Sequence, residues 1–169
     1  MSELSADLSS ASSDTPHRSL SWLILLALAV GGFGIGTGEF VIMGLMPTMA
    51  ADLGVSEPQV GHVISAYALG VVVGAPILAV LGARLYRRHL LLLLMGFFAL
   101  GNAATALAPG YHSLILARFV TGLPHGAYFG VAALVAASMV PSHKRAAAVS
   151  QVMLGLTIAI LIGNPLATL

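Results

Sequence analysis

The sequence predicts an all-α fold: a polytopic membrane bundle of five transmembrane helices with a cytoplasmic amino terminus. The 169 residues are 58% hydrophobic and 8% charged, and the mean hydropathy of +0.97 is too apolar for an ordinary soluble domain. Five apolar runs each reach the roughly 20 residues that a helix needs to cross the hydrocarbon core. The short connections between these runs favour an antiparallel arrangement.

The first nineteen residues differ in composition from the rest of the chain. They are rich in serine, carry Glu3, Asp7 and Asp14, and have little apolar surface to bury. We therefore expect residues 1–19 to form a disordered cytoplasmic tail. A cleaved signal peptide is not expected, because the first basic residue is Arg18 and the apolar run that follows it is too long.

The transmembrane bundle is expected to occupy residues 20–169. Cytoplasmic loops carry an excess of Lys and Arg, so the charges that flank the spans predict the orientation. Asp52 and Glu57 fall on one side of the membrane, which is expected to be the outside. The expected spans cover residues 20–50, 58–83, 89–108, 113–140 and 146–169. The basic residues that fall on the opposite side are Arg18, Arg84, Arg87, Arg88, Lys144 and Arg145.

Two charged residues, Glu39 and Arg118, lie inside expected spans. From the helical rise, Glu39 lies roughly 16 Å and Arg118 roughly 8 Å below the outer ends of their spans. A charge at such depth costs about 2.5 to 3.5 kcal/mol on insertion scales and usually faces a bundle interior or a water-filled cavity. Arg118 could instead extend to the outer surface, and Glu39 could be protonated and only structural. Whether the two residues pair directly stays open.

We expect Glu39 and Arg118 to line a central cavity that handles protons or substrate. Met43 lies one turn after Glu39 on the same helix face and would add an adaptable apolar wall, although packing is the commoner role of Met. His125 lies two turns after Arg118 and is the best of the six histidines for a proton or substrate role. An interior histidine with a structural hydrogen bond is the competing interpretation.

Glycine and proline in the spans indicate close helix packing and kinks. Small residues let helix backbones approach each other, and an interior proline removes a hydrogen bond. Ordinary membrane packing explains the same pattern, because both residue types are common in membrane spans. The positions are Gly70, Gly74, Gly122, Pro124, Gly126, Gly130, Gly163 and Pro165.

Several kinds of chemistry are not expected. The chain has no cysteine, which excludes disulfides and thiolate catalysis. No histidine pair has the spacing of a metal site, and no nucleophile stands beside a base, so we expect no metal, no cofactor and no enzymatic activity. The 7 basic and 6 acidic residues nearly balance, so no strong field attracts nucleic acid.

Three segments together resemble a known family. They are "GTGEFVIMGLMPTMAADLGVS" in the first span, "ISAYALGVVVGAPI" in the second and "LARFVTGLPHG" in the fourth. From about Leu20 to Leu169 the chain is similar to the amino-terminal part of the major facilitator superfamily. More narrowly, it resembles the twelve-span drug:proton antiporter branch and its arabinose-efflux-permease-like subgroup.

The resemblance implies proton-coupled efflux of drugs, sugars or related metabolites by alternating access in the bacterial inner membrane. Arg118 and Gly122 occupy the R-x-x-x-G positions of the family's fourth helix, where the arginine lines the cavity and helps to couple protons to transport. The family's cytoplasmic gating loop is matched in part by "AVLGARLYRR". Ala83 replaces the expected aspartate, while three arginines agree with the family pattern: Arg84, Arg87 and Arg88.

The family consists of two six-helix halves with the substrate between them. The chain ends soon after the fifth expected span, so we expect a truncated sequence and a missing carboxy-terminal half. The other expected partners are the lipid bilayer, protons and a small-molecule substrate. A nonfunctional fragment and a small oligomeric membrane channel are the alternatives to transport.

Overall fold

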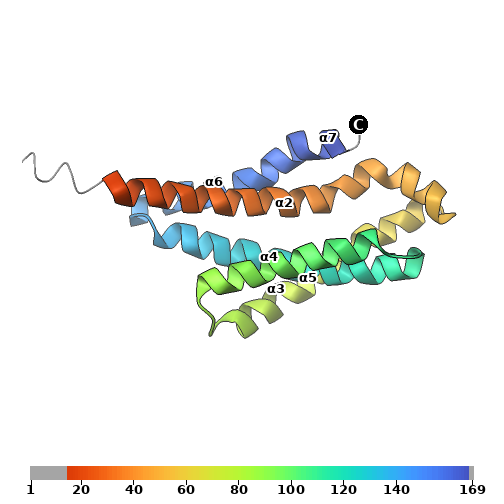
Figure 1. The fold of residues 1–169 in the computed structure, drawn as a ribbon, viewed down its shortest axis with the longest axis horizontal. Helices are drawn as coiled ribbons and strands as arrows, with labels where there is room; N and C mark the ends of the chain where they lie inside the picture. The colour runs from red at the N-terminus through yellow and green to blue at the C-terminus, as the bar shows by residue number, and fades with distance from the viewer. Residues whose placement is uncertain (1–14, 168–169) are drawn as a thin grey trace, which may run out of the picture.

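The computed structural model of the chain describes residues 15–167 and contains helices and no strand over that range (Figure 1). Four long helices come first: α2 (Thr15–Leu53), α3 (Glu57–Gly82), α4 (Arg87–Ala106) and α5 (Tyr111–Ser138). A short 3₁₀ turn, η1 (Ser142–Lys144), leads into α6 (Arg145–Ile158). A π-helical segment, η2 (Ala159–Gly163), and α7 (Asn164–Ala167) follow α6 directly.

Five helical segments are long and apolar enough to cross a membrane, which confirms the predicted bundle of five spans. They cover Ser21–Leu53, Glu57–Gly82, Arg87–Ala106, Tyr111–Ser138 and Ser142–Gly163. Helix α2 begins at Thr15, inside the stretch that we expected to be a tail. A proline such as Pro16 is tolerated there, because the first turn of a helix has no partner for its N–H groups. The expected tail up to residue 14 lies outside the described residues.

The helices form two groups that run along the long axis of the molecule (Figure 1). Helix α2 lies beside α6, and α3 and α4 both pack against α5. Helix α5 joins the two groups, since it also contacts α2 and α6. A side chain on α5 can therefore meet residues from every other long helix.

Glycines bring α3 and α5 into backbone contact. A Cβ atom added at Gly70 would meet the Phe119 carbonyl oxygen and would lie 3.2 Å from the Cα of Gly122. A Cβ added at Gly122 would in turn collide with the Tyr67 carbonyl oxygen. Close packing of this kind is a main attraction between helices in lipid, where apolar burial gives little drive. The other two glycines of this contact are Gly74, against Leu123, and Gly126, against Ala75.

Gly130 does not belong to this contact, although we expected it to take part in close helix packing like Gly122 and Gly126. It is exposed, and an added Cβ would have nothing within 4 Å. A helix has 3.6 residues per turn, so a spacing of four drifts around the axis, and eight residues rotate the position by about 80°. Gly130 has therefore turned away from α3.

A second glycine contact joins α2 to α6 and η2. A Cβ added at Gly36 would lie 2.8 Å from the Ala159 Cβ, and one added at Gly163 would lie 2.7 Å from Thr37 Oγ1. The π-helical turn ends at Gly163, two residues before Pro165. Because proline lacks the N–H that an α-helical bond requires, a break in the regular hydrogen bonding is expected close to it.

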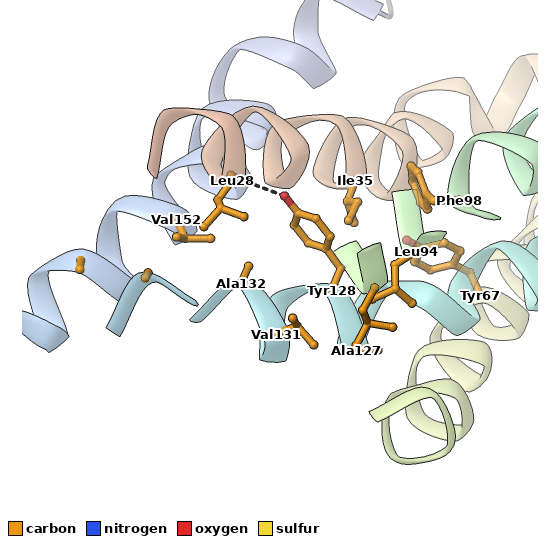
Figure 2. Close-up of a cluster of buried hydrophobic side chains, with 13 residues drawn as sticks. Leu28, Ile35, Tyr67, Leu94, Phe98, Ala127, Tyr128, Val131, Ala132 and Val152 are labelled. Atoms are coloured by element: carbon orange, nitrogen blue, oxygen red, sulfur yellow. Dashed lines mark hydrogen bonds between the residues drawn. The ribbon is translucent and has the colours of Figure 1, made fainter. Parts of the chain in front are cut away.

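Tyr128 ties the two groups together inside the core (Figure 2). Its hydroxyl donates a hydrogen bond of 2.8 Å to the Leu28 carbonyl of α2. Buried apolar side chains surround it, among them Ile35, Val131 and Val152. The bond satisfies a buried hydroxyl that would otherwise be costly.

The contact between α3 and α5 makes a direct stability prediction. Gly122→Val should destabilise the protein by about 2 to 3 kcal/mol, because the new side chain would overlap the backbone of α3. Gly130→Val is the matched control on the same helix and should change stability by less than about 0.5 kcal/mol. Reversible unfolding in detergent micelles would measure both variants. Equal losses would contradict the assigned contact.

Candidate functional site

Arg118 of α5 is buried inside the bundle, with 1% of its surface exposed. Its Nη1 donates a hydrogen bond of 3.0 Å to the carbonyl of Gly38, the residue before Glu39. The guanidinium therefore does not extend to the outer surface, which was the structural alternative for this residue. It binds the α2 backbone instead.

Tyr67 of α3 supports the same guanidinium. Its ring centroid lies 4.2 Å from the Arg118 Cζ, which is cation–π geometry. Two further donors of Arg118, Nε and Nη2, are buried and have no hydrogen-bond partner within the described part of the chain. Unpaired buried donors are costly, so the N–H groups of these two nitrogens leave the burial of Arg118 incompletely compensated within the described residues.

Glu39 lies next to this anchor but pairs with another residue. Its Oε2 is 3.7 Å from Nδ1 of His125, a contact between two ionisable side chains that becomes an ion pair only when the imidazole is protonated. The Glu39 side chain is 26% exposed and that of His125 is 13% exposed. Arg118 thus binds the peptide beside Glu39 in this structure, and its hydrogen bond goes to the Gly38 carbonyl and not to the Glu39 carboxylate.

His125 has a second, shorter contact. Its Nδ1 lies 2.9 Å from the Tyr67 hydroxyl oxygen, and its ring packs against Phe129 with the centroids 5.2 Å apart. The imidazole therefore meets α2 through Glu39 and α3 through Tyr67. Since Tyr67 contacts both Arg118 and His125, the four residues form one connected polar cluster in an apolar bundle.

Tyr67 was not among the residues selected from the sequence. It lies in "ISAYALG", part of a segment that carries the family resemblance, but a tyrosine in an apolar run suggested no chemistry, and it is 58 residues from His125 along the chain. Its place is set by the glycine contact, because its own carbonyl lies against Gly122. Only the packing of α3 on α5 brings it to the charged residues.

Met43 is 47% exposed, one helical turn after Glu39. It belongs to neither of the two buried clusters of the core. Met43 is therefore not packed inside the described core, and its role as an apolar wall stays a prediction.

The three arginines of the predicted cytoplasmic gating loop are not part of the polar cluster around Glu39. Arg84 is in the connection between α3 and α4, but Arg87 and Arg88 are the first two residues of α4 and not part of the loop. All three are exposed. Arg87 and Arg88 border a cavity of about 810 Å³ between α2, α4 and α5, whose lining includes Leu28 and Tyr128. The polar cluster around Glu39 does not line this cavity.

No group of three or more metal-binding side chains occurs among the residues that the structure describes. The polar residues of the cluster are one carboxylate, one imidazole, one phenol and one guanidinium, on three helices. Such groups can exchange protons and bind charged or polar molecules. The fold and the cluster together define a multi-pass membrane protein with an ionisable site inside its bundle.

The family is shown by comparison with known proteins. The family model described as Major Facilitator Superfamily matches residues 28–169, and the chain therefore belongs to this superfamily of transporters. It is 53% identical over 144 residues to the inner membrane transport protein YdhP of Escherichia coli strain K12, a match that covers 85% of this chain and 37% of that protein.

Two further relatives are more distant. The MFS-type transporter YtbD of Bacillus subtilis strain 168 is 43% identical over 144 residues, 85% of this chain and 36% of that protein. A chloramphenicol resistance protein of Streptomyces lividans is 37% identical over 143 residues, again 85% of this chain and 36% of that protein. The chain thus spans little more than a third of the length of these relatives.

These findings confirm the resemblance and the location expected from the sequence. The five apolar helices and the likeness to an inner membrane transport protein make the chain a multi-pass protein of the inner membrane. Two of the relatives are named as transporters, and the third is named for resistance to chloramphenicol. Membership of a transporter family agrees with the expectation, from the sequence, that the chain is not an enzyme.

Proposed function

We propose that this chain forms the amino-terminal bundle of a proton-coupled transporter that exports small molecules by alternating access. The observation that carries the proposal is the partly exposed Glu39 carboxylate, which faces His125 between α2 and α5 beside the buried Arg118. Charged side chains within membrane spans are rare and usually mark ion or substrate pathways. The relatives support transport, and the cluster suggests how it would be coupled.

Glu39 is the proposed proton carrier. It is accessible enough to exchange a proton with a water-filled cavity, and it has a basic partner, the His125 imidazole, within 3.7 Å. A substrate that binds at the partly exposed carboxylate competes with the proton, so that the proton leaves when the substrate arrives. Met43 supplies an apolar surface for such a substrate.

The proposed substrate class is a drug, a sugar or a related metabolite. The name of the Streptomyces lividans relative connects that protein with chloramphenicol, and we take chloramphenicol as the first probe for this protein. The second wall of the cavity is proposed to come from a further helical bundle, since the matched relatives are much longer than this chain.

Export requires a defined orientation, and we propose that the amino terminus is cytoplasmic. Arg84, Arg87 and Arg88 then lie on the cytoplasmic side with Lys144 and Arg145, as the excess of basic residues on that side requires. On the cytoplasmic side, Arg84, Arg87 and Arg88 are suited to a gate. Their exposed guanidinium groups can pair with acidic groups of a second bundle when that side closes.

The orientation can be tested with a matched pair of substitutions. His112 lies at the start of α5 and His143 lies in η1, beyond the other end of α5, and both are exposed. Because the chain has no cysteine, His112→Cys and His143→Cys each introduce one new thiol. His112→Cys should react with a membrane-impermeant maleimide on intact cells, and His143→Cys only after permeabilisation. The reverse pattern would refute the orientation.

The coupling role of Glu39 is tested by efflux. Vesicles that contain the protein expressed from its complete coding sequence should move chloramphenicol when a pH gradient is imposed. Glu39→Gln keeps the size of the side chain but cannot release a proton, so pH-driven movement should fall at least about tenfold. Glu57→Gln, at the exposed start of α3, is the control and should retain the wild-type rate. Undiminished pH-driven efflux in Glu39→Gln would sink the proposal.

A further inference from the structure

Two groups from different helices approach the same nitrogen of His125. The Tyr67 hydroxyl oxygen lies 2.9 Å from Nδ1, and Glu39 Oε2 lies 3.7 Å from it. An imidazole nitrogen has either one N–H or one lone pair in the plane of its ring. Nδ1 therefore makes one good hydrogen bond at a time, and the shorter distance gives that bond to Tyr67 in this structure.

The chemistry of Tyr67 fixes the direction of this bond. Tyr67 is 2% exposed, and its hydroxyl has no other hydrogen-bond partner over the described residues. If Nδ1 of a neutral His125 carried the proton, the Tyr67 O–H would be a buried donor without an acceptor, which is costly. In the favourable arrangement Tyr67 donates to the lone pair of Nδ1, and Nε2 carries the imidazole proton.

A proton that arrives at Nδ1 must end this arrangement. The protonated nitrogen becomes a donor, and the Glu39 carboxylate is a stronger acceptor for it than a phenol oxygen, because the bond is then charge-assisted. The step is balanced: the O–H bond of protonated Glu39 breaks, the Nδ1–H bond forms, and the Tyr67 O–H loses its acceptor. The products are a carboxylate and an imidazolium in contact.

We propose that Tyr67 is a positioning residue that holds neutral His125 away from Glu39, so that His125 exchanges Tyr67 for Glu39 when it takes up the proton. The proposal deepens the proposed function and rests on Glu39 being its proton carrier. Tyr67 acts through His125 and is not itself a proton carrier.

The surroundings of His125 allow few competing partners. The ionisable groups that face the cluster are Glu39 on α2, Tyr67 on α3 and Arg118 on α5 itself. Helices α4 and α6 carry ionisable side chains only in their first turns: Arg87, Arg88 and His89 in α4, and Arg145 in α6. Among the described helices, the exchange of partners is therefore confined to the residues of the cluster.

Tyr67 also connects the exchange to the helix contacts. Its ring stacks on Arg118 at 4.2 Å, and Arg118 binds the Gly38 carbonyl next to Glu39. When the Tyr67 hydroxyl loses His125, the same side chain still supports the guanidinium that anchors α2. Tyr67 and Arg118 thus join the site of the exchange to α2, α3 and α5.

The experiment compares Tyr67→Phe with Tyr128→Phe in the protein expressed from its complete coding sequence. Both changes delete one buried hydroxyl, but the Tyr128 hydroxyl binds the Leu28 carbonyl and not His125. The first measurement is ¹⁵N NMR of histidine-labelled protein, with the His125 signals assigned by their loss in His125→Gln. The second is the pH dependence of chloramphenicol efflux.

In the wild-type protein, neutral His125 should be the Nε2–H tautomer with a hydrogen-bonded Nδ1. Tyr67→Phe should remove the hydrogen-bond shift of Nδ1 and should move the titration of His125, and with it the efflux profile, to higher pH by about half to one unit. The reason is that the neutral imidazole loses the bond that favours it. Tyr128→Phe should leave the tautomer, the titration and the profile unchanged.

Any of three results would overturn the proposal. The first is an Nδ1–H tautomer of neutral His125 in the wild-type protein, and the second is an unchanged Nδ1 signal in Tyr67→Phe. The third is an equal change of the His125 signals in Tyr67→Phe and Tyr128→Phe. The NMR measurement does not depend on transport. If Tyr67→Phe alters the His125 titration while Glu39→Gln keeps full pH-driven efflux, the proposed function is refuted and the partner exchange stands. If Glu39→Gln abolishes pH-driven efflux while Tyr67→Phe leaves the Nδ1 signal and the titration of His125 unchanged, the partner exchange is refuted and the proposed function stands.

Discussion

The burial of Arg118 is the interaction on which the rest of the site depends. A guanidinium with 1% of its surface exposed is an expensive group to place inside an apolar bundle. The Gly38 carbonyl and the Tyr67 ring compensate for it only in part, since Nε and Nη2 stay without a partner in the described range. The incomplete compensation agrees with the proposed role of the cluster in transport.

The glycine contacts make this burial geometrically feasible. Gly70 and Gly122 let the backbones of α3 and α5 touch, which brings Tyr67 against the guanidinium of Arg118 and beside His125. On the other side, Gly36 and Gly163 let η2 pack tightly against the part of α2 that leads to Glu39. Close approach of the backbones thus lets short polar contacts form between side chains of three different helices.

The sequence predicted the number and type of helices well, because length and hydropathy dominate in a bilayer. Within the site it identified the two charges and His125, since ionisable residues in an apolar run stand out without any knowledge of packing. It did not identify Tyr67, and it placed Gly130 in a contact from which helical drift removes it. Both depend on how one helix is rotated against another. That rotation follows from close packing between distant segments, which a spacing pattern does not contain.

The central claim is that the cluster around Glu39 exchanges a proton for a substrate. Its most direct test is proton release on binding, measured in detergent with a weakly buffered pH indicator as chloramphenicol is added to the protein from its complete coding sequence. We predict that the wild-type protein releases about one proton per molecule bound. We predict no release from Glu39→Gln at the same occupancy. Equal release from both proteins, or binding to the wild type without any release, would contradict the account.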